Sequence, residues 1–569
     1  MRQVSAQPNG RLLLGAGAAG LLLFLVLQIF PELSRVIRDP DATRHIAETE
    51  AEAAAVRFAE DHFGGAFEPA GTVHQIQTLL YGYLSREDLA EDYDERYGEQ
   101  YPVETWQVEL HGGGDDVLFV HVHMDTGEIV AWNRLAEDGG HRMEFGAASL
   151  AARAFAIERG YPAQALHLRG LPEDGTIVFD SPDQRIGDAK LTLRIDVRQD
   201  VHGTVRVTSF KPAFEVPEAY ADDVGRQDRI SSILTFAGYM GLSFVLFVIA
   251  IVYAALLRRQ TSFARGLMLS GIFLVFYQIN NVNMFDGIRA SLGETADAGS
   301  MAVFLTVVQV LYTLGVAVSV YFAFVGGDGL WRSMGYNRWM RRGEPGFGAD
   351  VWRAVKIGYC AAFALLGLQA VIFLVMERGV GVWSSADVTQ STLNFRWAWL
   401  FPLLAWCAAI SEEAMYRLFG VGLFRRWFRN TAAASVIPTV IWALGHVAYP
   451  LYPWSTRLIE LTIIGLLFCW LFVRYGFAAA LFAHAVFDLV LMATTLMFLG
   501  GADAILAGVF YIAHPIGIAW LIHWWDRRRP PKPVEPAPVA PAGEPGSAAP
   551  GSVAPGPAAP ELGEQPGPA

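Results

Sequence analysis

The sequence predicts a polytopic α-helical membrane protein of about ten transmembrane helices, with an extracytoplasmic α+β domain made of two repeats. The 569-residue chain is 53% hydrophobic with a mean hydropathy of +0.31, which is too apolar for an ordinary soluble enzyme. Its acidic residues are concentrated in one block: residues 31–229 hold 38 acidic and 19 basic residues, a net charge of −19. Apolar stretches long enough to cross a bilayer, about 20 residues each, flank this block.

The first apolar stretch is predicted to be a retained anchor. Arg2 and Arg11 precede an apolar run at residues 12–30. A secretory signal begins in the same way, but no small-x-small cleavage site clearly follows this run. We therefore assign residues 1–30 to an N-terminal transmembrane anchor.

Nine further apolar stretches follow the acidic block. They lie at about 230–257, 264–284, 300–325, 354–376, 396–424, 431–449, 458–474, 477–499 and 502–525. We place the second to fourth spans and a cytoplasmic loop in residues 230–349 and a helical core in residues 350–526.

Arginine clusters follow every second span, at 258–265, 332–342, 425–429, 474 and 527–529. Basic loops stay preferentially on the cytoplasmic side of a membrane. We therefore expect a multi-pass protein of the cell (inner or plasma) membrane, with both termini cytoplasmic and residues 31–229 extracytoplasmic.

The acidic block is predicted to hold two copies of one helix-and-sheet unit, at about residues 45–136 and 147–216. A helix near 47–63 precedes strands near 103–111, 117–124 and 128–135, and a helix near 147–159 precedes strands near 176–180, 190–199 and 204–214. The turn at 125–128 and this element order are similar to PepSY-type domains. The resemblance implies a regulatory or substrate-presenting role. His121 and His123 share a strand face and are expected to be solvated.

Residues 527–569 are rich in proline, alanine and glycine and have few charges. A segment of this composition cannot bury enough apolar surface to form a core. We predict a disordered cytoplasmic tail.

Charged side chains interrupt an apolar stretch in the C-terminal third of the chain, at Glu412, Glu413 and Arg417. Each ionised group at bilayer depth costs about 2.5 to 3.5 kcal/mol on insertion scales, so such groups usually pair or line a functional cavity. Glu413 and Arg417 are four residues apart and share a helix face, whereas Glu412 is rotated by about 100° and is free to face a cavity. Taken alone, this motif is equally consistent with a structural ion pair.

Two later apolar stretches carry Trp442 with His446, and His484 with Asp488. His446 alone would fit a hydrogen-bonded core histidine. His484 and Asp488, one helical turn apart, would fit a local hydrogen bond. Their occurrence in successive apolar segments makes a shared polar pocket the stronger interpretation.

The three motifs read Glu-Glu-x-x-x-Arg, aromatic-x-x-x-His and His-x-x-x-Asp, in this order. They resemble the signature of the CPBP family of intramembrane proteases, also called the type II CAAX prenyl endopeptidase or Abi family. The resemblance covers roughly residues 350–525. The family usually has phenylalanine where this chain has Trp442, a difference that affects packing more than chemistry.

The resemblance implies an intramembrane endopeptidase. In its terms Glu412 is the general base for water with His446 beside it, Arg417 fixes Glu413, and His484 with Asp488 orients water or stabilises the oxyanion. Glu412, His446 and His484 would also supply a carboxylate and two imidazoles to Zn²⁺, as in catalytic zinc sites. The chain has no His-Glu-x-x-His helix, and a metal-free reaction through glutamate stays open.

The expected partners are a peptide or membrane-protein substrate and the lipid bilayer. The acidic block argues against a nucleic-acid partner. The sequence indicates neither an oligomeric state nor a prenylated substrate. The alternative from another functional class is a catalytically idle membrane scaffold or immunity-type protein. We favour an enzyme, in a membrane protein of bacterial type, because every catalytic-type side chain is retained.

Overall fold

The computed structural model describes residues 10–38, 45–135, 141–169, 176–200 and 203–528. The predicted tail therefore lies outside the described residues from position 529 onward. Two parts are treated in turn. The sheet domain comprises the described part of residues 45–215, and the membrane domain comprises residues 10–38 and 218–528.

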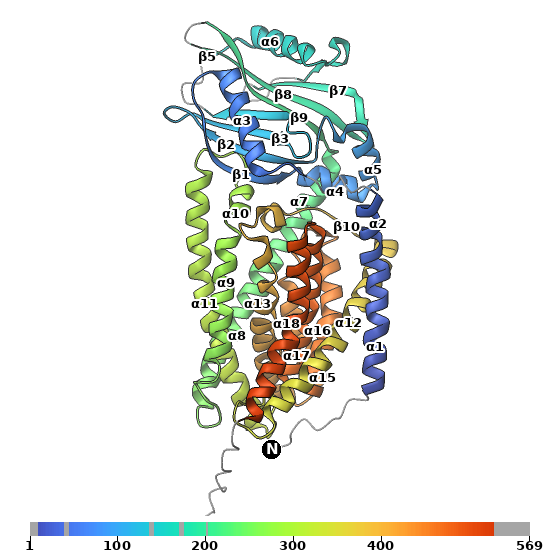
Figure 1. Ribbon diagram of the computed structural model, residues 1–569, viewed down its shortest axis with the longest axis vertical. Coiled ribbons are helices and arrows are strands. Elements are labelled where there is room, and N and C mark those ends of the chain that lie inside the picture. The colour runs from blue at the N-terminus through green and yellow to red at the C-terminus, as the bar shows by residue number, and fades with distance from the viewer. Residues whose placement is uncertain (1–9, 39–44, 136–140, 170–175, 201–202, 529–569) are drawn as a thin grey trace, which may run out of the picture. The chain divides into compact units, whose positions relative to one another are not determined.

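The sheet domain is built on one antiparallel sheet with the strand order β1-β2-β3-β4-β9-β8-β7-β6, and β5 pairs with β8. The strands are β1 (Glu68–Ile76), β2 (Glu104–His111), β3 (Val117–His123), β4 (Ile129–Leu135), β5 (His141–Arg142), β6 (His167–Leu168), β7 (Ile177–Ile186), β8 (Ala189–Gln199) and β9 (Val205–Glu215). The two halves meet where β4 pairs with β9, at Trp132 opposite Phe210. Figure 1 shows the resulting sheet with its helices.

Each half of the sheet follows one helix, α3 (Glu48–Phe63) in the first and α6 (Phe145–Glu158) in the second. Both helices bury alanine at every fourth position: Ala51, Ala55 and Ala59 in α3, and Ala148, Ala152 and Ala156 in α6. Residues four apart share a helix face, so these small side chains let each helix lie close to its strands. A helix followed by a four-stranded meander thus occurs twice, with one strand more in each half than the three that were expected. The PepSY resemblance stays a prediction.

Sequence patterns missed part of the first half. Strand β1 and the helices α4 (Thr78–Arg86) and α5 (Ala90–Tyr93) were not expected. The prediction that His121 and His123 are solvated is wrong. His123 is 6% exposed, and His121 contacts Glu294 of the membrane domain with an Nε2 to Oε1 distance of 2.9 Å.

The chain is a membrane protein. Seven helices among the described residues are long and apolar enough to cross a bilayer: Gly10–Ile37, Glu218–Leu256, Ala298–Ser333, Phe347–Val380, Ser455–Tyr475, Phe477–Phe498 and Ala502–Arg527. The pair α9 (Leu267–Asn283) and α10 (Phe285–Ser291), bent by 50°, makes an eighth if it is counted as one span. The figure of about ten transmembrane helices stays a prediction.

Several of these long helices comprise consecutive elements. The first contains α1 (Gly10–Phe24) and α2 (Phe30–Arg38), and the second contains α7 (Glu218–Ile233) and α8 (Leu242–Leu256). The remaining five are α11 (Ala298–Ser333), α12 (Phe347–Val380), α16 (Ser455–Tyr475), α17 (Phe477–Phe498) and α18 (Ala502–Arg527).

The two predicted spans that carry the first motifs are shorter than expected. The predicted span 396–424 starts in short 3-10 turns and becomes helical only as α13 (Leu403–Glu412), a π-helical segment (Glu413–Val421) and α14 (Gly422–Phe428). In the predicted span 431–449 only α15 (Thr431–Leu444) is helical, and residues 445–448 form turns. His446 therefore lies just beyond a helix end.

The N-terminal helix packs along α12, as Figure 1 shows. A Cβ at Gly20 would lie 2.3 Å from the carbonyl oxygen of Phe363, and a Cβ at Gly17 would lie 2.9 Å from that of Cys360. Small residues permit such close approach of helix backbones in membranes. The predicted anchor is thus part of the helical packing around the core.

Candidate active site

The three motifs converge in the membrane domain although they lie on separate helices. Glu412 and Glu413 lie at the junction of α13 and the π-helical segment, His446 follows α15, and His484 and Asp488 lie on α17. The Oε1 atom of Glu412 is 4.0 Å from Nε2 of His446, and its Oε2 atom is 3.7 Å from Nε2 of His484. All six residues expected at the site thus gather around one pair of carboxylates.

The π-helical segment explains how two adjacent glutamates serve different partners. Such wide turns shift the helical phase and occur often at functional sites. Glu413 and Arg417 within it are fully buried and form an ion pair with an Nη1 to Oε1 distance of 3.1 Å. Glu412, just before it, points instead toward the two histidines and keeps 16% of its side chain exposed. The expected division between a paired and an available carboxylate agrees with this geometry.

Arg417 is enclosed by aromatic rings as well as by its carboxylate partner. Its guanidinium carbon lies 4.2 Å from the ring centre of Trp442 and 5.3 Å from that of Phe468. Aromatic faces attract cations, more strongly when water is excluded. The buried charge of Glu413 is therefore offset by a cation that is itself held on two sides.

His484 is oriented by Glu413. Its Nδ1 lies 2.9 Å from Oε1 of Glu413 and, because a carboxylate accepts, Nδ1 donates. The other ring nitrogen, Nε2, faces Glu412 and lies 3.4 Å from Oδ2 of Asp488. Phe468 stacks on the imidazole at a centroid distance of 4.8 Å, which fixes the ring plane.

His446 is oriented by a backbone carbonyl. Its Nδ1 lies 3.0 Å from the carbonyl oxygen of Trp442, so Nδ1 carries the hydrogen of the neutral ring. Nε2 is then an acceptor directed toward Glu412. The indole of Trp442 also donates from Nε1 to Oε2 of Glu412. Trp442 therefore positions both the carboxylate and the imidazole beside it, and this role exceeds the packing role expected for it.

A second charged group near the site was not expected. Arg457 pairs with the buried Glu460 at 2.8 Å, and Gln369 donates to the same carboxylate at 2.8 Å. The Arg457 guanidinium lies 5.3 Å from the ring of Tyr449, which stacks on His446. The signal in the sequence was a charged i, i+3 pair at the start of an apolar helix.

The expected Zn²⁺ donors lie close together but are not arranged as a ready-made metal site. Among the residues that the structure describes, no group of three or more His, Cys, Asp or Glu side chains is placed to hold a metal ion. His484 and His446 each present Nε2 to Glu412, but the same carboxylate already accepts from Trp442. The zinc hypothesis stays a prediction.

Comparison with known proteins finds a family that is similar to part of this domain. Residues 394–490 match the family model of the type II CAAX prenyl endopeptidase Rce1-like proteins, and this range contains all three motifs. The expected resemblance is thus confirmed for the part of the chain that forms the site.

One curated relative is similar over a longer range. The chain is 23% identical over 311 residues to the sporulation-killing factor biosynthesis protein SkfC of Bacillus subtilis (strain 168). The similarity covers 53% of this chain and 59% of SkfC, so the chain spans less than two thirds of that relative. No solved structure gives a significant match.

Proposed function

We propose that the chain is an intramembrane endopeptidase that hydrolyses peptide bonds of membrane-associated substrates with water activated by Glu412. One observation carries the proposal. A partly exposed carboxylate lies within 4.0 Å of two imidazoles whose other ring nitrogens are fixed by Glu413 and by the Trp442 carbonyl. Fixed acid, base and hydrogen-bonding groups of this kind are what peptide hydrolysis requires. The family match supports the same reaction class.

Glu412 is the general base in this mechanism. It accepts a proton from water while the water oxygen attacks the carbonyl carbon of the scissile bond. His446 carries its hydrogen on Nδ1. Its Nε2 therefore accepts a hydrogen bond from the second O–H of that water and orients the water molecule. Glu412 then returns its proton to the departing amine nitrogen as the C–N bond breaks, so water is the only co-reactant consumed.

His484 and Asp488 act on the other oxygen. The negative charge that develops on the substrate carbonyl oxygen needs a donor that is already in place. His484 supplies one at Nε2 when it carries hydrogens on both ring nitrogens, while its Nδ1 stays hydrogen-bonded to Glu413 and Asp488, 3.4 Å from Nε2, stabilises that positive charge. Arg417 pairs with Glu413 and holds it in place, and thus acts through His484 without reaching the substrate.

Comparative peptidomics of membranes tests the proposal. Membranes that contain the wild-type chain are expected to accumulate cleavage products that are absent with Glu412→Ala. Identical peptide profiles would contradict endopeptidase activity. Chelator treatment of the same membranes tests the metal hypothesis, since the metal-free mechanism predicts unchanged products and a zinc enzyme would lose them reversibly.

A further inference from the structure

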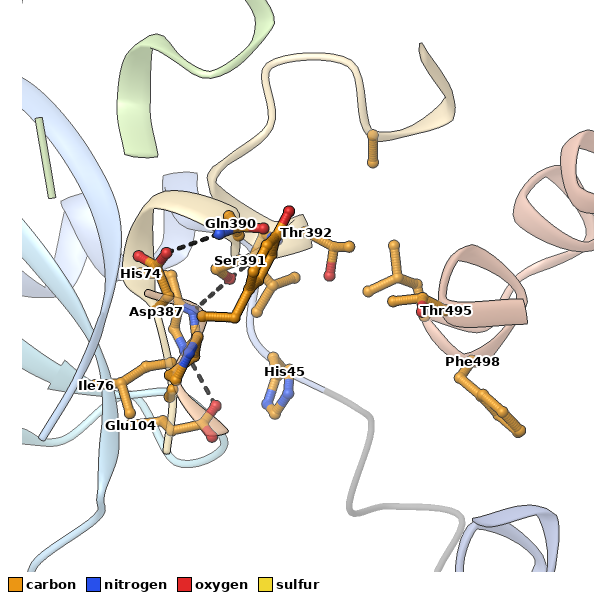
Figure 2. A pocket seen from close by; sticks show the side chains of 16 residues that line it. His45, His74, Ile76, Glu104, Asp387, Gln390, Ser391, Thr392, Thr495 and Phe498 are labelled. Atoms are coloured by element: carbon orange, nitrogen blue, oxygen red, sulfur yellow. Dashed lines mark hydrogen bonds and ion pairs between the residues drawn. The ribbon is translucent and has the colours of Figure 1, made fainter. Parts of the chain in front are cut away.

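A cavity of about 650 Å³ lies between the sheet domain and the loops of the membrane domain. Its lining includes His74 and Ile76 of β1, Glu104 of β2 and Asp387 of the segment that precedes α13. Figure 2 shows these side chains on one side of the pocket and Thr495 and Phe498 of α17 on the other. None of these residues belongs to the catalytic groups described above.

The cavity lies next to the candidate active site. Tyr449 lines it and stacks on His446, with a ring-centroid distance of 5.7 Å and an interplanar angle of 11°. Thr495 lies two helical turns, about 10 Å, beyond Asp488 on the same helix. A polypeptide in the cavity would therefore contact Tyr449, the neighbour of His446.

The walls of the cavity are fixed by bonds between the two domains. The side chain of Asn394 accepts from the backbone N–H of His74 at 2.7 Å and donates to its carbonyl at 3.0 Å. Nδ1 of His74 lies 2.8 Å from the hydroxyl of Ser391. β1 is an edge strand, and the segment before α13 is held against it. The sheet domain is thus joined to the segment that leads into the catalytic helix.

A second cavity, of about 540 Å³, shares His45 and Glu104 with the first and is lined by His123. Nδ1 of His123 accepts from the backbone N–H groups of Asp125 and Thr126 at 3.1 and 3.3 Å. The hydrogen of the neutral ring is therefore on Nε2, which is buried and has no hydrogen-bond partner among the residues that the structure describes. An unpaired buried donor is costly, so this atom indicates a missing acceptor, such as a peptide carbonyl.

Carboxylates outnumber the three histidines, His45, His74 and His123, in the lining of the two cavities. Their described lining residues include five carboxylates and no lysine or arginine: Asp94, Glu99, Glu104, Asp125 and Asp387. Burial raises the pKa of Glu104, but the hydrogen bond and charge of His74 and the charge of His45 outweigh it, so the pKa lies below its ordinary value. Glu104 is thus ionised at neutral pH.

We propose that the two cavities form a binding groove for an extended, positively charged peptide segment next to the scissile bond of the substrate. The inference rests on the proposed endopeptidase function and names its substrate class. A carbonyl of the segment accepts from Nε2 of His123, and a lysine or arginine side chain lies between Glu104 and Asp387. Anionic lipid headgroups are disfavoured because the same carboxylates repel them.

The test measures peptide binding by the full chain in lipid nanodiscs. Two short fluorescent peptides are used as probes, one with a central Lys-Lys pair and one with Gln-Gln at the same positions. Glu412→Gln serves as the background so that no probe is cleaved. The lysine peptide is expected to bind more tightly. Glu104→Gln and Asp387→Asn are each expected to weaken its binding about two- to fivefold, because partly exposed ion pairs contribute up to about 1 kcal/mol.

Asp115→Asn is the matched control, since Asp115 is an exposed carboxylate of the sheet domain outside both cavities. It should leave both affinities unchanged. Equal affinity for the two peptides, or no effect of the Glu104→Gln and Asp387→Asn pair, would overturn the groove.

Cleavage of both peptides by the wild type is measured in parallel. Cleavage without a preference for lysine would disprove the groove and leave the endopeptidase intact. Charge-dependent binding with neither peptide cleaved would support the groove and count against the proposed function.

Discussion

At the scale of one residue, substitutions of Asp488 test whether its hydrogen bonding or its charge supports catalysis beside His484. Its Oδ2 atom lies 3.4 Å from Nε2 of His484, one helical turn away. If it orients that ring, the near-isosteric Asp488→Asn should keep much of the activity, and Asp488→Leu should lose most of it. Cleavage rates of both variants on one peptide, with His484→Ala as the inactive reference, make the comparison. An Asp488→Asn enzyme reduced about 10²- to 10⁴-fold would show a charged role instead.

The Glu413–Arg417 pair makes a prediction about stability. Both side chains are fully buried, so removing one leaves a charge without its partner. Arg417→Met is expected to destabilise the protein by about 3 to 5 kcal/mol, as for other broken buried pairs. Thermal unfolding in detergent measures the effect.

The matched control is the double variant Glu413→Gln with Arg417→Met, which removes both charges and keeps an acceptor for His484. It should recover much of the lost stability, since the cost arises from the uncompensated carboxylate. Equal destabilisation of the single and double variants would show that Arg417 acts by packing against Trp442 and Phe468 alone.

At the scale of elements, strong local patterns were predicted well and tertiary choices were not. The spacing of Glu413 and Arg417 sufficed for their ion pair, because residues four apart meet on any helix. The π-helical turn has no such signal, since its wide hydrogen bonding depends on what packs around Glu412. The end of α15 before His446 was also missed, because the apolar run continues through residues that the chain uses as turns.

The sheet domain shows the same limit. Alternating apolar residues predicted β8, in which Leu191, Leu193, Ile195 and Val197 are buried. β1 was missed because Val73 and Ile76 are its only large apolar residues, and because its outer edge is paired with the membrane domain. His123 was taken for a solvated residue because a sequence shows strand alternation but not which face a second element covers. Arg457 was missed because a sequence does not show which face of a helix lies toward the site.

The orientation of the elements in the membrane is predicted by the arginine clusters. A cysteine in place of the exposed Asp94 should react with an impermeant thiol reagent from outside intact cells, and one in place of the exposed Pro345 should react only after permeabilisation. The native Cys360, Cys407 and Cys469 are replaced in the background. Labelling in the reverse order would overturn the assignment of residues 31–229 to the outside.

At the scale of the whole molecule, a buried polar cluster joins the sheet domain to the membrane domain. Glu294, between α10 and α11, accepts from His121 and Lys211 and from the side-chain amide of Asn133 at 2.6 Å. Close by, Arg289 pairs with Glu109 at 2.6 Å. The His121–Glu294 and Arg289–Glu109 pairs are largely buried. Solvent therefore screens little of the charge interaction that holds the sheet domain to the membrane domain.

This cluster predicts a dependence of stability on acid. Burial raises the pKa of Glu294, but the hydrogen bond and charge of His121 and the charge of Lys211 outweigh it and lower the pKa to about 2. A carboxyl group whose pKa is lower in the folded state stabilises the fold at pH values above its ordinary pKa of 4.5. That contribution is lost as the pH falls toward 2.

The thermal unfolding temperature, measured as the pH is lowered across this range, should therefore fall more steeply for the wild type than for Glu294→Gln. The variant should be less stable at neutral pH, because it loses the charge that His121 and Lys211 face. Parallel pH profiles for the two proteins would show that Glu294 does not hold the domains together.

The central claim is that Glu412 activates water, and the rate of peptide cleavage by purified protein tests it most directly. Glu412→Gln keeps an acceptor for the Trp442 indole and removes only the base, while Glu377→Gln, at an exposed carboxylate of α12, is the matched control. With equal thermal unfolding of all three proteins, we predict a fall in kcat/KM of about 10²- to 10⁴-fold for Glu412→Gln and none for Glu377→Gln. A folded Glu412→Gln enzyme that cleaves at the wild-type rate would contradict the account.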